Sequence, residues 1–318
     1  MPYSITGGNV DVSQQQPPSN AKIITFVVTL SLVCATVLAI LASALREPQE
    51  IARELDRSRQ LMMSARILNY AGYFQIKKGD EYIPAKVEEG GRLVAAEDPE
   101  LPSRDQVFEV YQTRIQPMLA SREGELLTFE EAGINQREYI EDNRKRGYYH
   151  LPLMLVYKVL PNPSPDNNQD ERPDGFVIPI NGYGLWDAIY GFLAIEPNGD
   201  KVIGISWYEQ KETPGLGAVI TEPQWQNQFH CKEIFLPPPE GEKDLETAPL
   251  GLNVVKGEVE NVYGDRPRAK TSVDGIPGAT LTGNGVTNAY HHSLAPYRAF
   301  LIKINEKYGE NEEDGNGS

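Results

Sequence analysis

The distribution of apolar and polar positions sets one long apolar segment near the N-terminus apart from the rest of the chain. Residues 23–45 carry no charged side chain and are bracketed by Lys22 and Arg46. A helix of about 20 apolar residues spans a bilayer. A cleaved signal peptide has a shorter apolar region and a more basic leading flank, whereas Lys22 is the one basic side chain before this segment. The pattern therefore predicts a retained transmembrane helix at residues 22–46.

The segments on either side of this helix differ in character. Residues 1–21 are polar and lack apolar periodicity, which predicts a short flexible tail. After the apolar segment, apolar residues recur at helical spacing, at Ile51, Leu55, Met62 and Leu68. Pro48 precedes them and is accepted in a first helical turn. A second helix, acting as a stalk or as part of a core, is therefore expected to begin near Pro48.

Beyond residue 150 the apolar positions form short β-branched runs separated by Pro, Gly, Asn and Asp, as is typical of strands. Strands are expected at residues 153–160, 176–180, 191–196, 201–209 and 252–260. Residues 162–175, between the first two, form a long polar loop. Residues 80–150 are mixed and charge-rich, and helix is expected there without a defined position.

Two further helices are predicted in the C-terminal half. Thr221 and Pro223 suit the start of a short helix, with Thr221 as its N-cap. From Val286 onward, apolar residues at helical spacing predict a final helix that Pro296 interrupts. The acidic residues 306–318 are expected to be a disordered tail. The pattern as a whole predicts one α+β domain, residues 47–305, attached to a membrane helix.

Composition and charge narrow the class of protein. The chain has 318 residues, 40% of them hydrophobic, and a formal net charge of −15, so it is globular and acidic. It contains no basic run, which argues against a nucleic-acid partner. Cys34 lies in the apolar segment and Cys231 in the domain, so the domain cannot form an internal disulfide. His291 and His292 are adjacent on a predicted helix and do not share a face, so they predict no metal site.

One stretch, DGIPGATLTGNGV at residues 274–286, combines four glycines with Thr280 and Thr282 directly before the final predicted helix. Glycine and alanine leave backbone N–H groups accessible, and a helix start favours a phosphate. The two hydroxyls could donate to such a phosphate or be esterified by it. The spacing is neither that of a Walker A loop nor that of a Rossmann loop. A plain glycine-rich turn whose threonine caps the helix remains open from the residues alone.

Two other glycine-rich stretches favour a phosphate site over a plain turn. KETPGLGAVI, residues 211–220, carries Glu212 and Thr213, and GYGLWDAIYGF, residues 182–192, combines glycines with Trp186 and two tyrosines. Each alone could be a turn beside a strand. Three such loops with aromatic and hydroxyl side chains suggest a site for a flat ring with a phosphate tail, a shape that flavin mononucleotide (FMN) has.

At these motifs the sequence resembles the C-subunit family of the Na⁺-translocating NADH:quinone reductase, and the resemblance covers most of the chain. It rests on DGIPGATLT, KETPGLG, GYGLWDAIYGF and the single N-terminal apolar helix. The G subunit of Rnf-type complexes is the next most similar family, but GYGLWDAIYGF favours the Na⁺-pump family. In this family the C-terminal part, here about residues 175–305, binds FMN that is attached through its phosphate to a threonine, in a pattern like D-x-x-S/T-G-A-T.

Carried over to this chain, the pattern falls on Asp274, Gly278, Ala279 and Thr280. The resemblance implies that FMN is esterified to Thr280, with Thr282 as the alternative, and that a flavin transferase makes the bond. The chain departs from the pattern at Pro277, where the family has Ser or Thr. The helix start, placed near residues 284–286, is expected to offer N–H groups to the phosphate. The residues expected to contact the ring and ribityl chain are Gly184, Leu185, Trp186, Glu212, Thr213 and Leu216.

The resemblance implies an electron carrier in a sodium-pumping complex of a bacterial inner membrane, with neighbouring membrane subunits as partners and the domain on the periplasmic side. The basic residues suggest the opposite orientation, because the flank with more Lys and Arg usually faces the cytoplasm. Lys22 is the one basic residue before the apolar segment, whereas four arginines follow closely after it: Arg46, Arg53, Arg57 and Arg59. Two other functions remain open: an assembly subunit that never receives flavin, and a flavin enzyme with its own substrate. No acid–base or nucleophile constellation supports the last.

Overall fold

The computed structural model describes residues 19–79, 81–164, 172–241 and 243–309. The chain divides into two compact units after Arg53. Most of the first unit lies in helix α1 (Asn20–Ser64), whose portion Asn20–Arg46 has a mean hydropathy of 2.7 and is long and apolar enough to cross a membrane. Pro48 lies inside α1, so the prediction of a separate helix beginning there is wrong. Residues 1–18 of the expected N-terminal tail lie outside the described residues.

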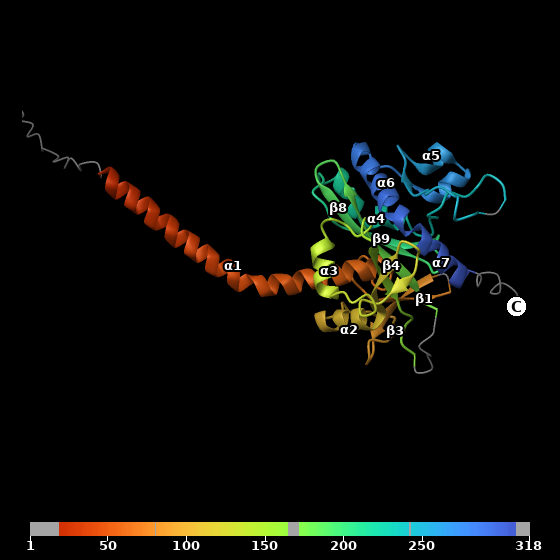
Figure 1. Cartoon of the computed structure of the whole chain (residues 1–318), viewed down its shortest axis with the longest axis horizontal. Helices are drawn as coiled ribbons and strands as arrows, with labels where there is room; N and C mark the ends of the chain where they lie inside the picture. The colour runs from red at the N-terminus through yellow and green to blue at the C-terminus, as the bar shows by residue number, and fades with distance from the viewer. Residues whose placement is uncertain (1–18, 80, 165–171, 242, 310–318) are drawn as a thin grey trace, which may run out of the picture. The chain divides into compact units, whose positions relative to one another are not determined.

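The second unit is an α+β domain built on a six-stranded antiparallel sheet (Figure 1). Its strand order is β5-β4-β6-β7-β8-β9. The strands are β4 (Ile115–Ser121), β5 (Leu126–Leu127), β6 (Leu153–Val159), β7 (Gly175–Tyr183), β8 (Ala188–Ile195) and β9 (Val202–Glu209). The four strands expected between residues 153 and 209 are confirmed. Residues 165–171 of the predicted polar loop lie outside the described residues.

Both faces of this sheet are buried under hydrophobic clusters. Successive side chains of a strand point to opposite faces, so neighbouring residues join different clusters. On β7, Phe176 and Ile178 join one hydrophobic cluster and Val177 joins the other. The first cluster also contains the apolar face of the two C-terminal helices. The second contains Leu61 and Met62, which are 1% and 0% exposed, so the last turns of α1 are part of the core of the domain.

The region whose secondary structure the pattern left undefined covers the second face. Two of its strands, β2 (Glu81–Val87) and β3 (Leu93–Ala95), form a three-stranded antiparallel sheet with β1 (Gln75–Lys78), which precedes the region. The helices expected there are α2 (Arg104–Arg114) and α3 (Gln136–Asn143). A capping box between Ser103 and Gln106 begins α2, and the Asn135 side chain caps α3.

The C-terminal part carries short elements around two longer helices. They are η1 (Gly217–Thr221), α4 (Pro223–Asn227), β10 (Asn253–Val254), α5 (Val259–Tyr263), η2 (Pro267–Thr271), β11 (Ser272–Val273), α6 (Thr280–Leu294), η3 (Ala295–Tyr297) and α7 (Arg298–Tyr308). Pro296 interrupts the final helix as predicted, by way of η3. Strands β10 and β11 form a two-stranded parallel pair.

Four expectations are corrected in this region. The N-cap of α4 is Glu222, because the hydroxyl of Thr221 donates to Ala218 O of the preceding turn. The strand expected over residues 252–260 has two residues, Asn253 and Val254, since the chain turns at Gly257 and enters α5. Helix α6 begins at Thr280 rather than at Val286. Helix α7 continues to Tyr308, so the predicted tail cannot begin at residue 306.

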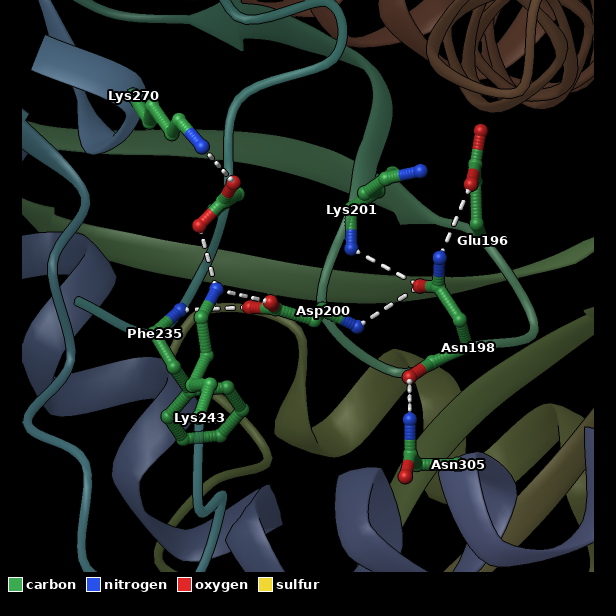
Figure 2. Close-up of polar contacts among 9 residues, drawn as sticks. Glu196, Asn198, Asp200, Lys201, Phe235, Lys243, Lys270 and Asn305 are labelled. Carbon is green, nitrogen blue, oxygen red and sulfur yellow. Dashed lines mark hydrogen bonds and ion pairs between the residues drawn. The ribbon is translucent and has the colours of Figure 1, made fainter. Parts of the chain in front are cut away.

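The turn between β8 and β9 connects these C-terminal segments (Figure 2). Asp200 accepts from Lys243 Nζ and from Phe235 N–H, at 2.5 and 2.8 Å, and Lys243 also pairs with Glu233. Asn198 O accepts from the side chain of Asn305 on α7 at 2.7 Å. One hairpin turn therefore holds the segment after β9 and the last helix in place.

Candidate functional site

The predicted attachment segment makes a tight turn before α6. Ala279 N–H donates to Ile276 O at 3.0 Å, which closes the turn, and Gly278 has a φ of +76°. A type II turn favours proline at its second position and needs positive φ at its third. Pro277 and Gly278 occupy these positions, so the departure from the family pattern at Pro277 has a local structural reason.

Thr280 is the first residue of α6 and is exposed. Within the described parts of the chain, its hydroxyl has no hydrogen-bond partner. The first N–H groups of a helix lack partners within it, and the helix dipole favours an anion there. Gly283 N–H already donates to Ala279 O at 3.0 Å. The unpaired N–H groups therefore belong to residues 280–282, not to residues 284–286 where the sequence placed them.

Thr282 has the opposite environment. It is 1% exposed, and its hydroxyl donates to Glu212 Oε2. Glu212 is also buried, at 5% exposed, and its Oε1 accepts from the backbone N–H groups of Leu185 and Trp186 at 2.9 and 3.0 Å. A Cβ at Gly184 would lie 2.4 Å from Glu212 Oε1. The three predicted loops are therefore joined at one buried carboxylate.

Exposed apolar side chains surround this junction. We call Tyr183, Leu185, Trp186, Leu216 and Leu281 the apolar rim; they are 77%, 47%, 69%, 42% and 60% exposed. In the described part of the second unit, only Leu101 and Val262 are other exposed large hydrophobic residues. Large apolar residues are ordinarily expected in the core. Leu185 and Trp186 are exposed instead, so neither is a core residue. Trp186 Nε1 donates to Thr213 Oγ1 at 3.2 Å, which orients the indole.

Close backbone contact holds the rim against α6. A Cβ at Gly285 would lie 2.1 Å from Tyr183 O, so the helix and the β7–β8 turn approach each other where no side chain intervenes. On the other side, a Cβ at Gly278 would lie 3.0 Å from Leu216 Cδ2. The rim therefore contacts both α6 and the turn that precedes Thr280.

A pocket of about 580 Å³ opens beside Thr280. Its apolar lining includes Trp225, Val254, Val255 and Ile276, which are 4–6% exposed. Its charged lining is Glu222, Glu258, Asp274 and Lys256. Trp225 and Lys256 were not predicted as site residues, because nothing in their own segments distinguishes them from helix and loop residues elsewhere.

Asp274, which matches the first position of the family pattern, lines the pocket and also supports the loop. Its Oδ1 accepts from Val259 N–H at 2.7 Å, and its backbone O accepts from Trp225 Nε1 at 3.0 Å. It thereby fixes the start of α5 and the indole of the pocket wall.

These residues fit FMN as a group. Thr280 offers an exposed hydroxyl at a helix N-terminus, where a phosphate is favoured. Trp186, Leu185 and Leu216 offer exposed apolar surface for a flat ring. In the described residues, no group of three or more His, Cys, Asp and Glu side chains is placed to hold a metal ion.

Comparison with known proteins agrees with this geometry. The family model of the FMN-binding domain matches residues 184–295, which include Thr280 and every residue of the apolar rim except Tyr183. The chain is 42% identical over 306 residues to the C subunit of the Na⁺-translocating NADH-quinone reductase of Chlamydia caviae, covering 93% of this chain and 95% of the relative. It is 31% identical to the C subunit of the same reductase from Yersinia pestis, covering 93% and 98%.

The solved structures support the fold. The crystal structure of the C subunit of the Na⁺-translocating NADH-quinone reductase from Parabacteroides distasonis aligns with a TM-score of 0.50 at 22% identity. The alignment covers 81% of this chain and 96% of that one. The α+β fold predicted from the sequence is confirmed. The chain belongs to the C-subunit family of the Na⁺-translocating NADH-quinone reductase.

Proposed function

We propose that this protein is a membrane-anchored electron carrier that holds FMN through a phosphoester on Thr280, within a sodium-translocating NADH:quinone reductase. The observation that carries the proposal is the contrast between two hydroxyls two residues apart. Thr280 is exposed at the N-terminus of α6, whereas Thr282 is 1% exposed and donates to Glu212. A transferase can approach Thr280, but reaching Thr282 would require the helix start to unfold.

The charges beside Thr280 support covalent attachment over reversible binding. The lining of the neighbouring pocket holds three carboxylates and one lysine, Lys256. A free phosphate monoester carries about −1.5 to −2 charges at pH 7 and is bound most firmly by several cationic donors. The pocket offers one such side chain. A bond to Thr280 reduces the charge of the phosphate and retains the cofactor without them.

The apolar rim is the proposed site of the isoalloxazine ring. Gly184, Leu185, Trp186, Thr213 and Leu216 are the residues we assign to ring and ribityl contacts. Trp186 is held at its indole nitrogen by Thr213 and leaves most of its surface open, at 69% exposed. FMN supplies the redox chemistry, and the protein fixes its position and environment. An exposed ring edge suits electron exchange with a neighbouring subunit.

The remaining parts of the proposal follow from family membership and from α1. The other membrane subunits of the complex are the proposed electron donors and acceptors, and a flavin transferase is the proposed maturation partner. The apolar part of α1 is the anchor in the bacterial inner membrane. We assign the FMN-bearing domain to the periplasmic side.

Mass spectrometry of the full chain, co-expressed with an active flavin transferase, tests the attachment site. FMN joined with loss of water adds roughly 438 Da, and we expect this gain on the peptide that contains Thr280. Thr280→Ala should abolish it, Thr280→Ser should retain it, and Thr282→Val should still be modified at Thr280.

Two results would contradict this assignment. A gain that persists in Thr280→Ala but is lost in Thr282→Val would move the tether to Thr282. No gain in the wild-type chain, with the transferase active on another acceptor, would favour an assembly subunit that does not carry flavin.

A further inference from the structure

Glu212 is the group that connects the three glycine-rich loops, and its contacts differ from those of a flavin ligand. Its carboxylate is buried and accepts three hydrogen bonds, two from backbone N–H groups and one from a threonine hydroxyl. In the part of the chain that the structure describes, no lysine or arginine forms an ion pair with it. The carboxylate of Glu212 therefore accepts its hydrogen bonds from groups of the protein.

The donors come from two separate elements. Leu185 and Trp186 belong to the turn between β7 and β8, since Tyr183 pairs with Ala188 across that hairpin. Thr282 belongs to the first turn of α6, two residues after the attachment threonine. Hydrogen bonds to an ionised group are shorter and stronger than those between neutral groups. The carboxylate therefore fixes the spacing between the hairpin turn and the helix start.

Two glycines leave the room that this carboxylate occupies. A Cβ at Gly184 would lie 2.4 Å from Glu212 Oε1. A Cβ at Gly217 would lie 2.5 Å from Glu212 Oε2 and 2.6 Å from Thr282 Oγ1. Glycines in GYGLW and in PGLG are thus explained by one carboxylate, which ties both motifs to Thr282.

Thr213, the residue after Glu212, holds the side chain of Trp186. Thr213 Oγ1 accepts from Trp186 Nε1 at 3.2 Å, while Glu212 holds the backbone N–H of the same tryptophan. The adjacent pair Glu212 and Thr213 therefore fixes both the backbone and the indole of Trp186.

We infer that Glu212 is a positioning residue that holds Trp186 of the apolar rim in register with Thr280 by joining the hairpin turn to Thr282. This inference rests on the proposed function, since it concerns the FMN attached at Thr280. Glu212 does not contact the ring in this assignment, and Thr282 serves as its hydrogen-bond donor rather than as an attachment site. The negative charge of Glu212 lies within hydrogen-bond distance of the backbone of Leu185 and Trp186, the proposed ring contacts, so it should disfavour electron uptake by an attached flavin.

Four variants of the full chain test the inference: Glu212→Gln, Thr282→Val, Thr282→Ser and, as a control, Glu130→Gln, which alters an exposed glutamate in the segment before α3. The initial rate of mass gain with the transferase is measured first. Glu212→Gln and Thr282→Val should lower it about tenfold, the effect of losing one charge-assisted hydrogen bond. Thr282→Ser and the control should match the wild type.

The midpoint potential of the attached flavin provides a readout that a general loss of stability would not move. After extended incubation to complete loading, Glu212→Gln should shift the potential to more positive values, because a negative charge near the ring is removed. Thr282→Ser should leave it unchanged. Thermal unfolding of each variant shows whether it is folded. If Glu212→Gln is unfolded, the rates of mass gain of Thr282→Val and Thr282→Ser are compared instead, and they test the inference.

The inference is overturned if the folded Glu212→Gln and Thr282→Val variants match the wild type in both rate and potential. It is also overturned if Thr282→Ser is as impaired as Thr282→Val, because the hydroxyl would then not be the group that matters. Failure of the wild-type chain itself to gain mass would instead refute the attachment at Thr280, so the two failures are distinguishable.

Discussion

His291 is a single residue that makes the stability of the folded domain depend on pH. It lies on α6, and burial is the main reason that its pKa is lowered, with Arg268 and His292 lowering it further. A backbone hydrogen bond to Leu252 opposes the shift. Its Nε2 is buried without a partner among the described residues. The neutral ring is therefore the form that the folded protein favours.

We predict that the folded state loses stability as the pH falls below the ordinary histidine pKa of about 6.5. The unfolded chain takes up the proton first, so the loss begins near that pH and continues down to the lowered folded pKa. His291→Asn keeps an N–H group for Leu252 but does not titrate. Because the ring is half-buried and partly screened, the melting temperature of the wild type should fall about 1–2 °C more than that of the variant between pH 7.5 and 5.5. Equal falls would contradict the prediction.

The attachment motif could be predicted at this scale because it is contiguous. Thr280, Gly278 and Ala279 stand within three residues of each other, and their role in a turn before a helix follows from residue type. The environment of Glu212 could not be predicted, because Thr282 lies 70 positions away and only the packed structure brings them together. The ring contact expected of Trp186 requires an accessible indole although residue type alone favours burial, and the structure shows that indole exposed.

At the scale of elements, Lys243 forms ion pairs with Asp200 and Glu233, which we call the Lys243 cluster (Figure 2). The cluster holds the segment after β9 that contains Glu233 and Lys243 to the β8–β9 turn. The side chains of Lys243, Asp200 and Glu233 are 17%, 15% and 18% exposed. Removing one member of a buried ion pair leaves its partner charges without compensation. Lys243→Met keeps the apolar stem but removes the cation that pairs with Asp200 and the nearer of the two that pair with Glu233, since Lys270 lies 3.8 Å from Glu233.

We predict that Lys243→Met lowers the free energy of unfolding by about 2 kcal/mol. The matched control is Lys303→Met, which breaks the ion pair with Glu125, whose side chains are 39% and 67% exposed. An exposed pair contributes about 0–1 kcal/mol, so the control should change little. Urea unfolding of both variants measures the difference. Similar losses in the two would show that the cluster does not anchor the segment.

Elements were predicted where local pattern and tertiary packing agree. The two strands of the β7–β8 hairpin were predicted from their β-branched runs, but both extend into residues 182–192, which were expected to form a glycine-rich loop. The start of α6 was placed too late because Gly283 and Gly285 weaken a helical pattern. They occur there because Val254 and the backbone of Tyr183 pack against the bare helix. Strands β1–β3 were missed, since their polar residues are kept in strands by pairing with neighbours.

For the whole molecule, the count of basic residues and the periplasmic location proposed above place the domain on opposite sides of the membrane. The arginines after the apolar segment suggest the cytoplasm. Arg57 weakens that count, because its Nη2 donates to Tyr157 OH at 2.8 Å inside the domain. It is part of the folded domain rather than a free charge beside the membrane. Long domains also follow the charge rule poorly.

Cys231 provides a direct test of the orientation. It is exposed and unpaired on the domain, whereas Cys34 lies within the apolar part of α1. A membrane-impermeant maleimide added to cells with a permeabilised outer membrane should modify Cys231, because the proposed location is periplasmic. Cys231→Ser should remove the signal and so assign it to that thiol. Labelling that appears only after the inner membrane is disrupted would place the domain in the cytoplasm, and the flavin would then have to exchange electrons with its partners from that side.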